Sequence, residues 1–481
     1  MLRVQSDVPG GELAADVSRL RALVRSGATS SLAWRLDQLV ALRSALVRDE
    51  DVLVRALAVD LGKPAAEAMI TEIGVVVAEI DYVRRHLAGW VRGDKVRVGL
   101  AGWPGRASVE RCPLGVVLVV SPWNYPVYLG VMPVVSALAA GSCAVVKPSE
   151  LAPATAAALA RLLPAATPAA VVAEGGPSVV HEALSAGVDH LFFTGSTAVG
   201  RIVAESAGRL LVPVTLELGG KCPAVVDATV DPRAAARRIV WGKFANAGQT
   251  CVAPDYVLVH QEVADRFADE VCAAVRAFYG ADPRRSPDYG RIVDKRHLDR
   301  LLQILEGHAG RVVLGGGCDP DDRYLAPTVV REPALSSRLM REEIFGPVLP
   351  VVAVADVPRA LEVVGALPDP LAVYAFTRDA GTIRALRDGT RSGGFFVNVA
   401  KSQLGIAGLA FGGIGQSGTG SSRGRLGVEA LSQHRSLYAR PAWPDLALHH
   451  PPYGNLGTWL LRRMLHMPGR PRHEGAPTGR S

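Results

Sequence analysis

The pattern of hydrophobic and polar residues predicts a helical region in the N-terminal part of the chain. From Leu20 to about Leu87, apolar residues recur at helical spacing, for example at Leu36, Leu39 and Leu42. A spacing of three to four residues places these side chains on one face of a helix. We expect packing helices here, with no chemistry of their own.

Short apolar runs then alternate with alanine-rich helical segments. The runs are bounded by turn residues and cover 115–120, 143–146, 170–172, 190–193 and 214–216. Alternation of this kind is typical of a doubly wound parallel sheet. After Lys221 the alternation of helical segments and apolar runs begins again. Its first helix has Asp231 at the N-cap and Pro232 in the first turn. The sequence therefore predicts an α/β fold with two such units, the second continuing to about Lys401.

Length and composition narrow the class of protein. A chain of 481 residues exceeds what one hydrophobic core usually supports, so at least two domains are expected. Hydrophobic residues at 49% and charged residues at 21% are ordinary for a soluble globular protein. The sequence has no uninterrupted apolar run of the length that spans a bilayer, and its first residues do not form a secretory signal. We therefore expect a cytoplasmic protein without an integral membrane segment.

The cysteine spacing argues against a disulfide-bonded or zinc-binding protein, and the distribution of charge argues against a nucleic-acid-binding protein. The six cysteines form no CxxC pair and no zinc-finger spacing, so neither disulfides nor a metal site is predicted. The net charge is +7, yet the arginines are scattered among acidic residues instead of forming a basic stretch. Nucleic acid is therefore not an expected partner.

The candidate chemistry lies in the segment Asn246–Cys251, which follows Glu217–Lys221 by about thirty residues. It offers a thiol nucleophile and a carboxylate base in one region. A lone free cysteine usually behaves as a small buried hydrophobe, so the neighbouring motifs decide its role. These motifs are Ser121–Pro126, Phe193–Gly200 and Glu343–Pro347.

Together, these five ordered motifs resemble the aldehyde dehydrogenase superfamily. The sequences of Gly248–Tyr256 and of Pro451–Tyr453, near the C-terminus, are similar to those of the class 3 branch. This branch contains fatty, aromatic and coniferyl-type aldehyde dehydrogenases. The resemblance runs from about Leu20 to Tyr453. It implies a Rossmann-like NAD-binding domain at 1–90 and 113–220, a catalytic α/β domain at 221–402, and a bridging β element at 91–112 and 403–440 that mediates dimerisation. Residues 441–481 would be a C-terminal extension.

The same resemblance implies three catalytic residues. Cys251 would attack the aldehyde carbonyl and give a thiohemiacetal and then a thioester. Asn124 and the backbone N–H of Cys251 would stabilise the oxyanion, and Glu217 would activate the water that cleaves the thioester. Cys222, next to Lys221, is the nearest competing thiol and lacks the Gly-Gln-Thr that precedes Cys251.

The predicted cofactor is NAD, with NADP also accepted. The usual G-x-G-x-x-G is missing, and the turn Gly195–Gly200 between a strand and a helix would face the pyrophosphate instead. By resemblance Lys147 and Glu150 contact the adenosine ribose, where a carboxylate disfavours a 2′-phosphate. Glu343 would hold the nicotinamide ribose, with Phe345 packed nearby. The full predicted cofactor set is Trp123, Lys147, Ser149, Glu150, Gly195, Ser196, Gly200, Leu218, Gly219, Glu343 and Phe345.

Two loops depart from the class 3 pattern. Phe395–Lys401 keeps Asn398 but lacks the acid and the histidine expected after it, and Ser417–Gly424 lacks an expected aromatic residue and histidine. By resemblance these loops shape the substrate funnel and the subunit contact. The predicted activity is oxidation of a hydrophobic aliphatic or aromatic aldehyde to the acid.

Two alternatives remain open at this point. A CoA-acylating aldehyde dehydrogenase would use CoA in place of water, which the presence of Glu217 argues against. A catalytically silent member acting as a binding protein is a second alternative, which the intact Cys251, Glu217 and Asn124 argue against.

The C-terminal extension carries one apolar island, residues 456–467, followed by 468–481, which we expect to be disordered. The island is too short to span a membrane. We favour a helix packed on its own or a neighbouring subunit of a homodimer, and a peripheral membrane contact is the alternative.

Overall fold

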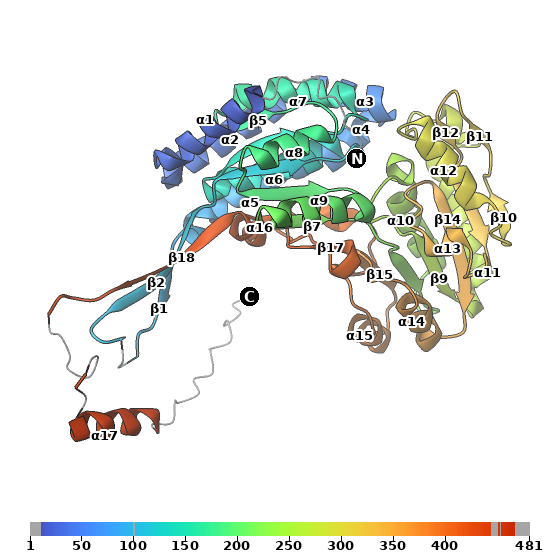
Figure 1. The fold of residues 1–481 in the computed structure, drawn as a ribbon. Coiled ribbons are helices and arrows are strands. Elements are labelled where there is room, and N and C mark those ends of the chain that lie inside the picture. The colour runs from blue at the N-terminus through green and yellow to red at the C-terminus, as the bar shows by residue number, and fades with distance from the viewer. Residues whose placement is uncertain (1–10, 100–101, 444–450, 453, 467–481) are drawn as a thin grey trace. The chain divides into compact units, whose positions relative to one another are not determined.

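The computed structural model describes residues 11–99, 102–443, 451–452 and 454–466 (Figure 1). The chain forms two compact units, residues 1–92 with 111–433 and residues 93–110 with 434–481. The first unit contains two large, mainly parallel sheets, so the predicted α/β class is confirmed. The finer domain boundaries expected from the sequence stay a prediction, and the segment 468–481 lies outside the described residues.

The helices expected between Leu20 and Leu87 are present. They are α1 (Glu12–Arg25), α2 (Leu32–Arg48), α3 (Glu50–Leu61), α4 (Ala65–Ala68) and α5 (Gly74–Trp90). A π-helical turn, η2 (Met69–Ile73), joins α4 to α5. Such wide turns are rare and occur often at functional sites.

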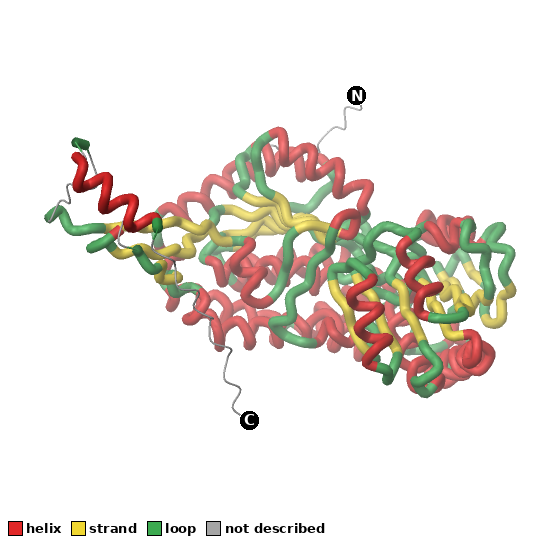
Figure 2. Tube along the Cα trace, turned by 90° about the horizontal axis from the view of Figure 1, so that it is seen from below, coloured by secondary structure: helices red, strands yellow, loops and turns green. Residues whose placement is uncertain are grey.

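The first sheet has six strands in the order β17-β7-β6-β3-β4-β5. Its parallel strands are β3 (Val116–Val120), β4 (Cys143–Lys147), β5 (Ala170–Val172), β6 (His190–Thr194) and β7 (Val214–Glu217), and β17 (Gly418–Thr419) adds an antiparallel edge. The connecting helices are α6 (Pro126–Ala140), α7 (Pro153–Ala166), α8 (Ser178–Ser185) and α9 (Thr197–Arg209), and α16 (Gly424–Ala430) follows β17. Figure 2 shows the strands with helices on both sides, the doubly wound arrangement that the alternating pattern predicts.

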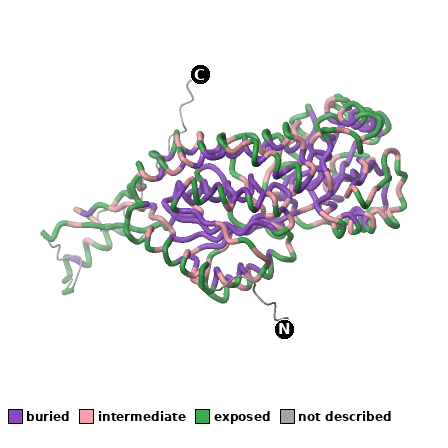
Figure 3. The backbone as a smooth tube through the Cα atoms, turned by 90° about the horizontal axis from the view of Figure 1, so that it is seen from above, coloured by how far each residue is buried: buried purple, intermediate pink, exposed green. Residues whose placement is uncertain are grey.

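Helix α6 lies at the centre of this unit. All of its residues are buried, as expected for a helix that is apolar on every face. Pro126 occupies its first turn, where a missing N–H costs nothing. Figure 3 shows the buried backbone concentrated along the strands and this central layer. Because α6 is fixed on all sides, the residues directly before it are fixed as well.

The second sheet has seven strands in the order β10-β13-β14-β9-β8-β15-β16. The strands are β8 (Pro223–Val226), β9 (Tyr256–His260), β10 (Arg311–Leu314), β13 (Thr328–Arg331), β14 (Val348–Val354), β15 (Ala372–Phe376) and β16 (Gly394–Val397). The helices of this region are α10 (Pro232–Phe244), α11 (Ala264–Tyr279), α12 (Lys295–Leu305), α13 (Arg338–Arg341), α14 (Val357–Gly365) and α15 (Ala380–Gly389), and a small hairpin pairs β11 (Cys318–Asp319) with β12 (Tyr324–Leu325). Asp231 accepts a hydrogen bond from the Arg233 N–H, which confirms the predicted N-cap.

A three-stranded sheet and the last helix belong mainly to the second unit. The sheet has the order β1-β2-β18, with β1 (Asp94–Val96), β2 (Arg106–Pro113) and β18 (Ser432–Ala439). Helix α17 (Gly454–Leu465) carries exposed Leu456, Trp459 and Leu465. Within the described part of the chain, no helix combines the length and apolar character that crossing a bilayer requires.

Helix α7 is capped by a side chain from α3. Its own N-cap residue, Ala152, supplies no side-chain cap, and Asp60 accepts hydrogen bonds from the N–H groups of Ala154 and Thr155 at 3.1 and 2.8 Å. The Thr155 hydroxyl donates to the same carboxylate at 2.7 Å. A buried carboxylate at a helix N-terminus stabilises the orphan N–H groups and the helix dipole.

Asp60→Ala should therefore lower stability by roughly 1–3 kcal/mol, because it leaves buried donors without an acceptor. Thermal unfolding followed by circular dichroism should show a melting temperature lower by roughly 2–6 °C. Asp51→Ala removes an exposed carboxylate from the first turn of α3 and is the matched control. Equal melting temperatures for the two variants would contradict the capping role.

Candidate active site

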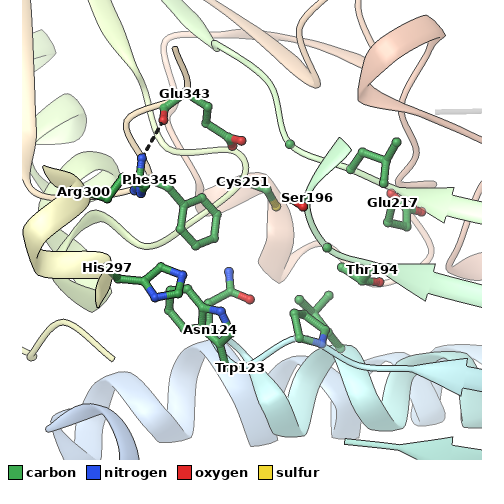
Figure 4. A pocket seen from close by; sticks show the side chains of 15 residues that line it. Trp123, Asn124, Thr194, Ser196, Glu217, Cys251, His297, Arg300, Glu343 and Phe345 are labelled. Atoms are coloured by element: carbon green, nitrogen blue, oxygen red, sulfur yellow. Dashed lines mark hydrogen bonds between the residues drawn. The ribbon is translucent and has the colours of Figure 1, made fainter. Parts of the chain in front are cut away.

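The predicted motifs meet where parallel strands of the first sheet end. Strand β3 leads to Asn124, β6 ends at Thr194 and β7 ends at Glu217. The carboxyl ends of parallel strands share one edge of a sheet, which is the usual place for a ligand in an open α/β fold. A cavity of about 300 Å³ opens there, lined by Pro122, Trp123, Asn124, Leu129, Thr194, Gly195, Ser196, Glu217, Leu218, Gly219, Cys251, His297, Arg300, Glu343 and Phe345. In Figure 4 the Cys251 sulfur lies in the middle of this group.

The loop before Cys251 has an unusual backbone. Asn246, Ala247 and Gly248 have φ angles of 54°, 50° and 77°, three successive residues in the left-handed region. Two of the three are not glycine, so the conformation is strained and needs support from its surroundings. Gln249 provides that support: its amide nitrogen donates to the carbonyls of Asn246 and Arg291, at 2.9 Å each.

Asn124 is tied to this loop in both directions. Its amide nitrogen donates to the Gln249 carbonyl at 3.0 Å, and its own carbonyl accepts from Asn246 Nδ2 at 2.8 Å. Lys63 Nζ also donates to the Asn124 carbonyl at 3.0 Å. An asparagine amide nitrogen carries two N–H groups, so Asn124 keeps a second donor for the cavity that it lines.

The thiol of Cys251 is held in its neutral form. Burial raises its pKa to about 12, and the charges on Glu343 and Glu217 add to the effect. A thiol is nucleophilic as the thiolate, so this one needs a base at the moment of attack.

Cys222 has a structural place beside the loop. Its thiol donates to the Cys251 carbonyl at 3.4 Å and its sulfur accepts from the Ala372 N–H at 3.3 Å. Burial raises the pKa of Cys222 far above its ordinary value. The competing thiol therefore positions the nucleophile loop instead of lining the cavity.

Glu217 is suited to accept a proton. Its side chain is buried at the end of β7, and neither carboxylate oxygen has a hydrogen-bond partner among the described residues. Burial raises its pKa to about 8, and the nearby hydroxyl of Ser422, which donates to the Phe411 carbonyl, offsets this only in part. A carboxyl group with a pKa near neutral exchanges protons readily at physiological pH.

Glu343 reaches the same cavity from the second sheet. Its carboxylate packs directly on Gly219, where an added Cβ would lie 2.0 Å from Glu343 Oε2. Burial raises its pKa to about 7, with a further contribution from Asp255. Glu343 Oε1 is buried and has no hydrogen-bond partner within the described part of the chain.

Aromatic rings form one wall of the cavity. The Trp123 ring meets the Phe345 ring edge to face at 5.4 Å and the His297 ring at 4.9 Å. Arg300 Nη2 donates to the Ile344 carbonyl at 2.6 Å and so holds the segment between Glu343 and Phe345 in place.

Four of the predicted cofactor residues do not line this cavity: Lys147, Ser149, Glu150 and Gly200. Lys147 ends β4 and its Nζ lies 2.6 Å from Glu150 Oε2. Burial tends to raise the pKa of Glu150, but the hydrogen bond and charge of Lys147 outweigh it, so the pKa lies below its ordinary value. Gly200 lets α9 approach Leu218, because a Cβ there would lie 2.6 Å from the leucine side chain.

Five lining residues were not predicted from the sequence. Pro122, Thr194 and Leu129 lie within or near the quoted motifs, so their neighbours gave a usable signal. His297 and Arg300 lie on α12, in a segment with no recognisable motif. Only the fold brings them to the cavity.

Comparison with known proteins shows that the chain belongs to the aldehyde dehydrogenase family, whose model matches residues 16–437. It is 40% identical over 441 residues to aldehyde dehydrogenase family 3 member B1 of Rattus norvegicus, covering 91% of this chain and 94% of the relative. It is 39% identical over 453 residues to an aldehyde dehydrogenase of Craterostigma plantagineum, covering 93% and 94%.

Solved structures of aldehyde dehydrogenases are also similar to this chain in fold. The structure of Staphylococcus aureus AldH in a substrate-bound state superposes with a TM-score of 0.88 at 36% identity, covering 94% of this chain and 99% of that one. An indole-3-acetaldehyde dehydrogenase in complex with NAD⁺ gives a TM-score of 0.81 at 28% identity, with coverages of 90% and 89%. The predicted family, fold and activity are therefore confirmed: the protein oxidises an aldehyde to a carboxylic acid with a nicotinamide cofactor.

The packing of Glu343 on Gly219 yields a prediction. Gly219→Ala should displace the Glu343 carboxylate, because the new Cβ has no room beside it. If Glu343 hydrogen-bonds the cofactor, the Kd for NAD⁺ measured by calorimetry should rise by roughly 10- to 100-fold.

Gly208→Ala is the control for this substitution. No heavy atom lies within 4 Å of a Cβ built at Gly208, which is in α9. Its Kd should stay close to that of the wild type, and an unchanged Kd in Gly219→Ala would contradict a cofactor role for Glu343.

Proposed function

We propose that Cys251, Asn124 and Glu217 carry out the oxidation as nucleophile, oxyanion donor and hydrolytic base. The observation that supports this best is their convergence on one cavity, with a buried thiol, a spare amide N–H and a carboxylate lacking hydrogen-bond partners in the described chain. Among the residues that the structure describes, no other thiol lines that cavity.

The residues around the cavity fit a nicotinamide cofactor. Glu343 has an oxygen without a described partner, which can accept hydrogen bonds from ribose hydroxyls, and Trp123 and Phe345 offer flat apolar surfaces. Ser196 caps α9 through its hydroxyl, so the N-terminus of that helix, with Gly195 beside it, borders the cavity. Helix N-termini favour phosphate groups. NAD(P)⁺ held by these residues would supply the two-electron acceptor that oxidation of an aldehyde adduct on Cys251 requires.

The remaining steps follow from the geometry of the chain's own groups. Water in the cavity takes the proton that Cys251 must lose before its sulfur bonds to the aldehyde carbon, and passes it to solvent. The spare N–H of Asn124 and the backbone N–H of Cys251 then stabilise the developing oxyanion. For hydrolysis, Glu217 takes a proton from water, whose oxygen adds to the thioester and releases the acid and the thiol.

We further propose that NAD is the preferred cofactor and NADP is accepted. Glu150 keeps a lowered pKa and is therefore ionised at neutral pH, which disfavours a 2′-phosphate beside it. Lys147 lies against Glu150 and weakens that repulsion, which is the reason to expect tolerance of NADP.

Substrate type, assembly and location are also proposals. The apolar side chains that line the cavity, among them Trp123, Leu129 and Phe345, support a hydrophobic aliphatic or aromatic aldehyde. A homodimer would provide a partner for the exposed apolar side chains of α17, and a membrane surface is the alternative partner. A cytoplasmic location stays a prediction.

Cys251→Ala should abolish aldehyde-dependent NADH production while leaving the Kd for NAD⁺ within about twofold, because other residues contact the cofactor. Absorbance at 340 nm and calorimetry measure the two quantities. Cys318→Ala removes an exposed thiol and is the control, with activity expected at the wild-type level. Turnover by the Cys251 variant would exclude it as the nucleophile.

The raised pKa of Glu217 predicts a pH dependence. Only the ionised carboxylate accepts a proton, so turnover should rise with pH and level off above a pKa of about 8. Glu217→Gln should remove that rise and slow hydrolysis by roughly 10²- to 10⁴-fold. Rapid mixing should then show a burst of NADH followed by a slow phase, with an acyl group on Cys251 by mass spectrometry.

The same experiment separates hydrolysis from acyl transfer. Added CoA should neither accelerate the wild-type enzyme nor yield acyl-CoA. Acyl-CoA formation, or a pH profile identical in wild type and Glu217→Gln, would rule out Glu217 as the hydrolytic base.

A further inference from the structure

Strands β10 and β13 place two arginines directly opposite each other. The strands are antiparallel neighbours, and Arg311 of β10 is paired with Arg331 of β13 in their register. Opposite residues of such a pair point to the same face of the sheet with their Cβ atoms about 5 Å apart, and like charges there are destabilising. A negative group between the two guanidinium groups would remove that cost.

Protection of the sheet edge does not account for this pair. Strand β10 is the edge of the second sheet, and a charged residue on an edge strand discourages pairing with other chains. Arg311 alone would be sufficient for that purpose. Arg331 lies on β13, which has a neighbouring strand on each side. The second arginine therefore calls for a different explanation.

A third arginine reaches the same place from helix α11. Arg276 lies in the last turn of α11, so three separate elements each contribute one arginine. The cavity that they border measures about 300 Å³ and is lined by Ala268, Asp269, Cys272, Arg276, Arg311, Val313 and Arg331. It shares no lining residue with the cavity at Cys251.

The guanidinium groups are available to a ligand. Within the described part of the chain, the side chains of Arg276 and Arg311 make no hydrogen bond or ion pair, and both residues are exposed to solvent. Arg331 Nη2 lies 2.6 Å from Asp265 Oδ1, but the Asp265 side chain is 87% exposed. Ion pairs with an exposed partner are weak, so a dissolved anion can compete with Asp265 for Arg331.

The buried thiol of Cys272 indicates that two of these charges act on one point of the cavity. Burial raises the pKa of Cys272, and the positive charges of Arg276 and Arg331 oppose that rise, while Asp269 adds to it. Arg276 and Arg331 are therefore both within electrostatic reach of a side chain that lines the cavity.

The shape of the donors and the presence of Asp269 favour a phosphate group. The planar fork of an arginine matches the oxygens of a phosphate. Asp269 would repel a fully ionised oxygen, but it can accept a hydrogen bond from a P–OH group. Inorganic phosphate keeps one O–H at neutral pH, whereas sulfate has none.

The volume of the cavity sets an upper limit on the ligand. A water molecule occupies about 30 Å³ in the liquid, so the cavity holds a phosphate group and has room for a short organic group attached to it.

We propose that Arg276, Arg311 and Arg331 form a phosphate-binding site that is separate from the active site. Its ligand is a phosphate group, either as inorganic phosphate or on a small phosphorylated metabolite. The inference goes beyond the proposed function and does not depend on the roles of Cys251, Asn124 and Glu217.

Calorimetric titration of the full chain with sodium phosphate tests this site. Saturating NAD⁺ is present throughout, so that phosphate cannot bind at the cofactor site, and sodium chloride keeps the ionic strength constant. Phosphate should bind with a Kd of roughly 0.1–1 mM. Sulfate should bind at least about 5-fold more weakly, because it offers no hydrogen bond to Asp269. Glycerol 3-phosphate, titrated in parallel, represents a phosphorylated metabolite.

Arg311→Met separates a ligand site from a structural role. Its Kd for phosphate should rise by roughly 10-fold or more, because a charged donor is lost. Without phosphate its melting temperature should be equal to or above that of the wild type, because the cross-strand repulsion is gone. Phosphate should raise the melting temperature of the wild type and leave that of Arg311→Met unchanged.

Arg276→Met supplies a second variant from a different element. It should also raise the Kd for phosphate by roughly 10-fold, since its guanidinium group has no partner within the described chain to lose. Arg384→Met removes an exposed arginine of α15 that does not line this cavity, and it should keep the wild-type Kd.

The outcomes divide clearly. Absence of binding up to roughly ten times the expected Kd, or a Kd for Arg311→Met equal to that of the wild type, would overturn the site. An equal rise in melting temperature with phosphate and with sodium chloride of the same ionic strength would also overturn it, because it would reflect screening of charges alone. Tighter binding of glycerol 3-phosphate than of inorganic phosphate, lost in the same variants, would support the site and assign its ligand to a phosphorylated metabolite.

Discussion

The buried ion pair between Lys221 and Asp255 joins three of the segments that form the cavity. Lys221 Nζ lies 2.5 Å from Asp255 Oδ2 and also donates to the carbonyls of Leu339 and Glu342 at 2.8 and 3.0 Å. The Ile344 N–H donates to the same carboxylate at 3.2 Å. Lys221 follows the Glu217 motif, Asp255 follows the Cys251 loop, and Ile344 follows Glu343. A buried pair is expensive unless its remaining donors and acceptors are satisfied, and here they are satisfied by these three segments.

Because the Lys221–Asp255 ion pair holds these segments in place, other polar groups of the cavity can remain without hydrogen-bond partners. Glu217 and Glu343 both have buried carboxylate oxygens without described hydrogen-bond partners, and burial raises both of their pKa values. In an ordinary core such groups would only cost stability. Beside a thiol whose pKa is also raised, they are the groups that we propose as the proton acceptor and as a hydrogen-bond acceptor for the cofactor. The instability is local, and the packed helix α6 and the two sheets compensate for it.

The sequence predicts the parts of the site that lie within contiguous motifs. Cys251, Glu217 and Asn124 could be named because each belongs to a short run whose neighbours point to the same chemistry, and the strands could be placed because buried parallel strands are continuous apolar runs. His297 and Arg300 could not be named, since helical periodicity on α12 says which face is buried but not which cavity it borders. The ion pair between Glu67 and Lys401 joins residues that are far apart in the sequence. Only the tertiary fold creates it.

This difference also separates the local from the long-range determinants of the site. The nucleophile loop is set by local backbone geometry, with left-handed residues at Asn246 and Ala247 supported by Gln249. Lys401 and Glu67 are instead positioned by long-range packing near Tyr125, whose ring faces Lys401 and whose hydroxyl hydrogen-bonds Thr250. A change at position 67 or 401 would therefore remove none of the hydrogen bonds by which Gln249 and Asn124 hold the Cys251 loop. The geometry of the loop before Cys251 therefore depends on its own backbone and on Gln249 and Asn124, and not on the ion pair between Glu67 and Lys401.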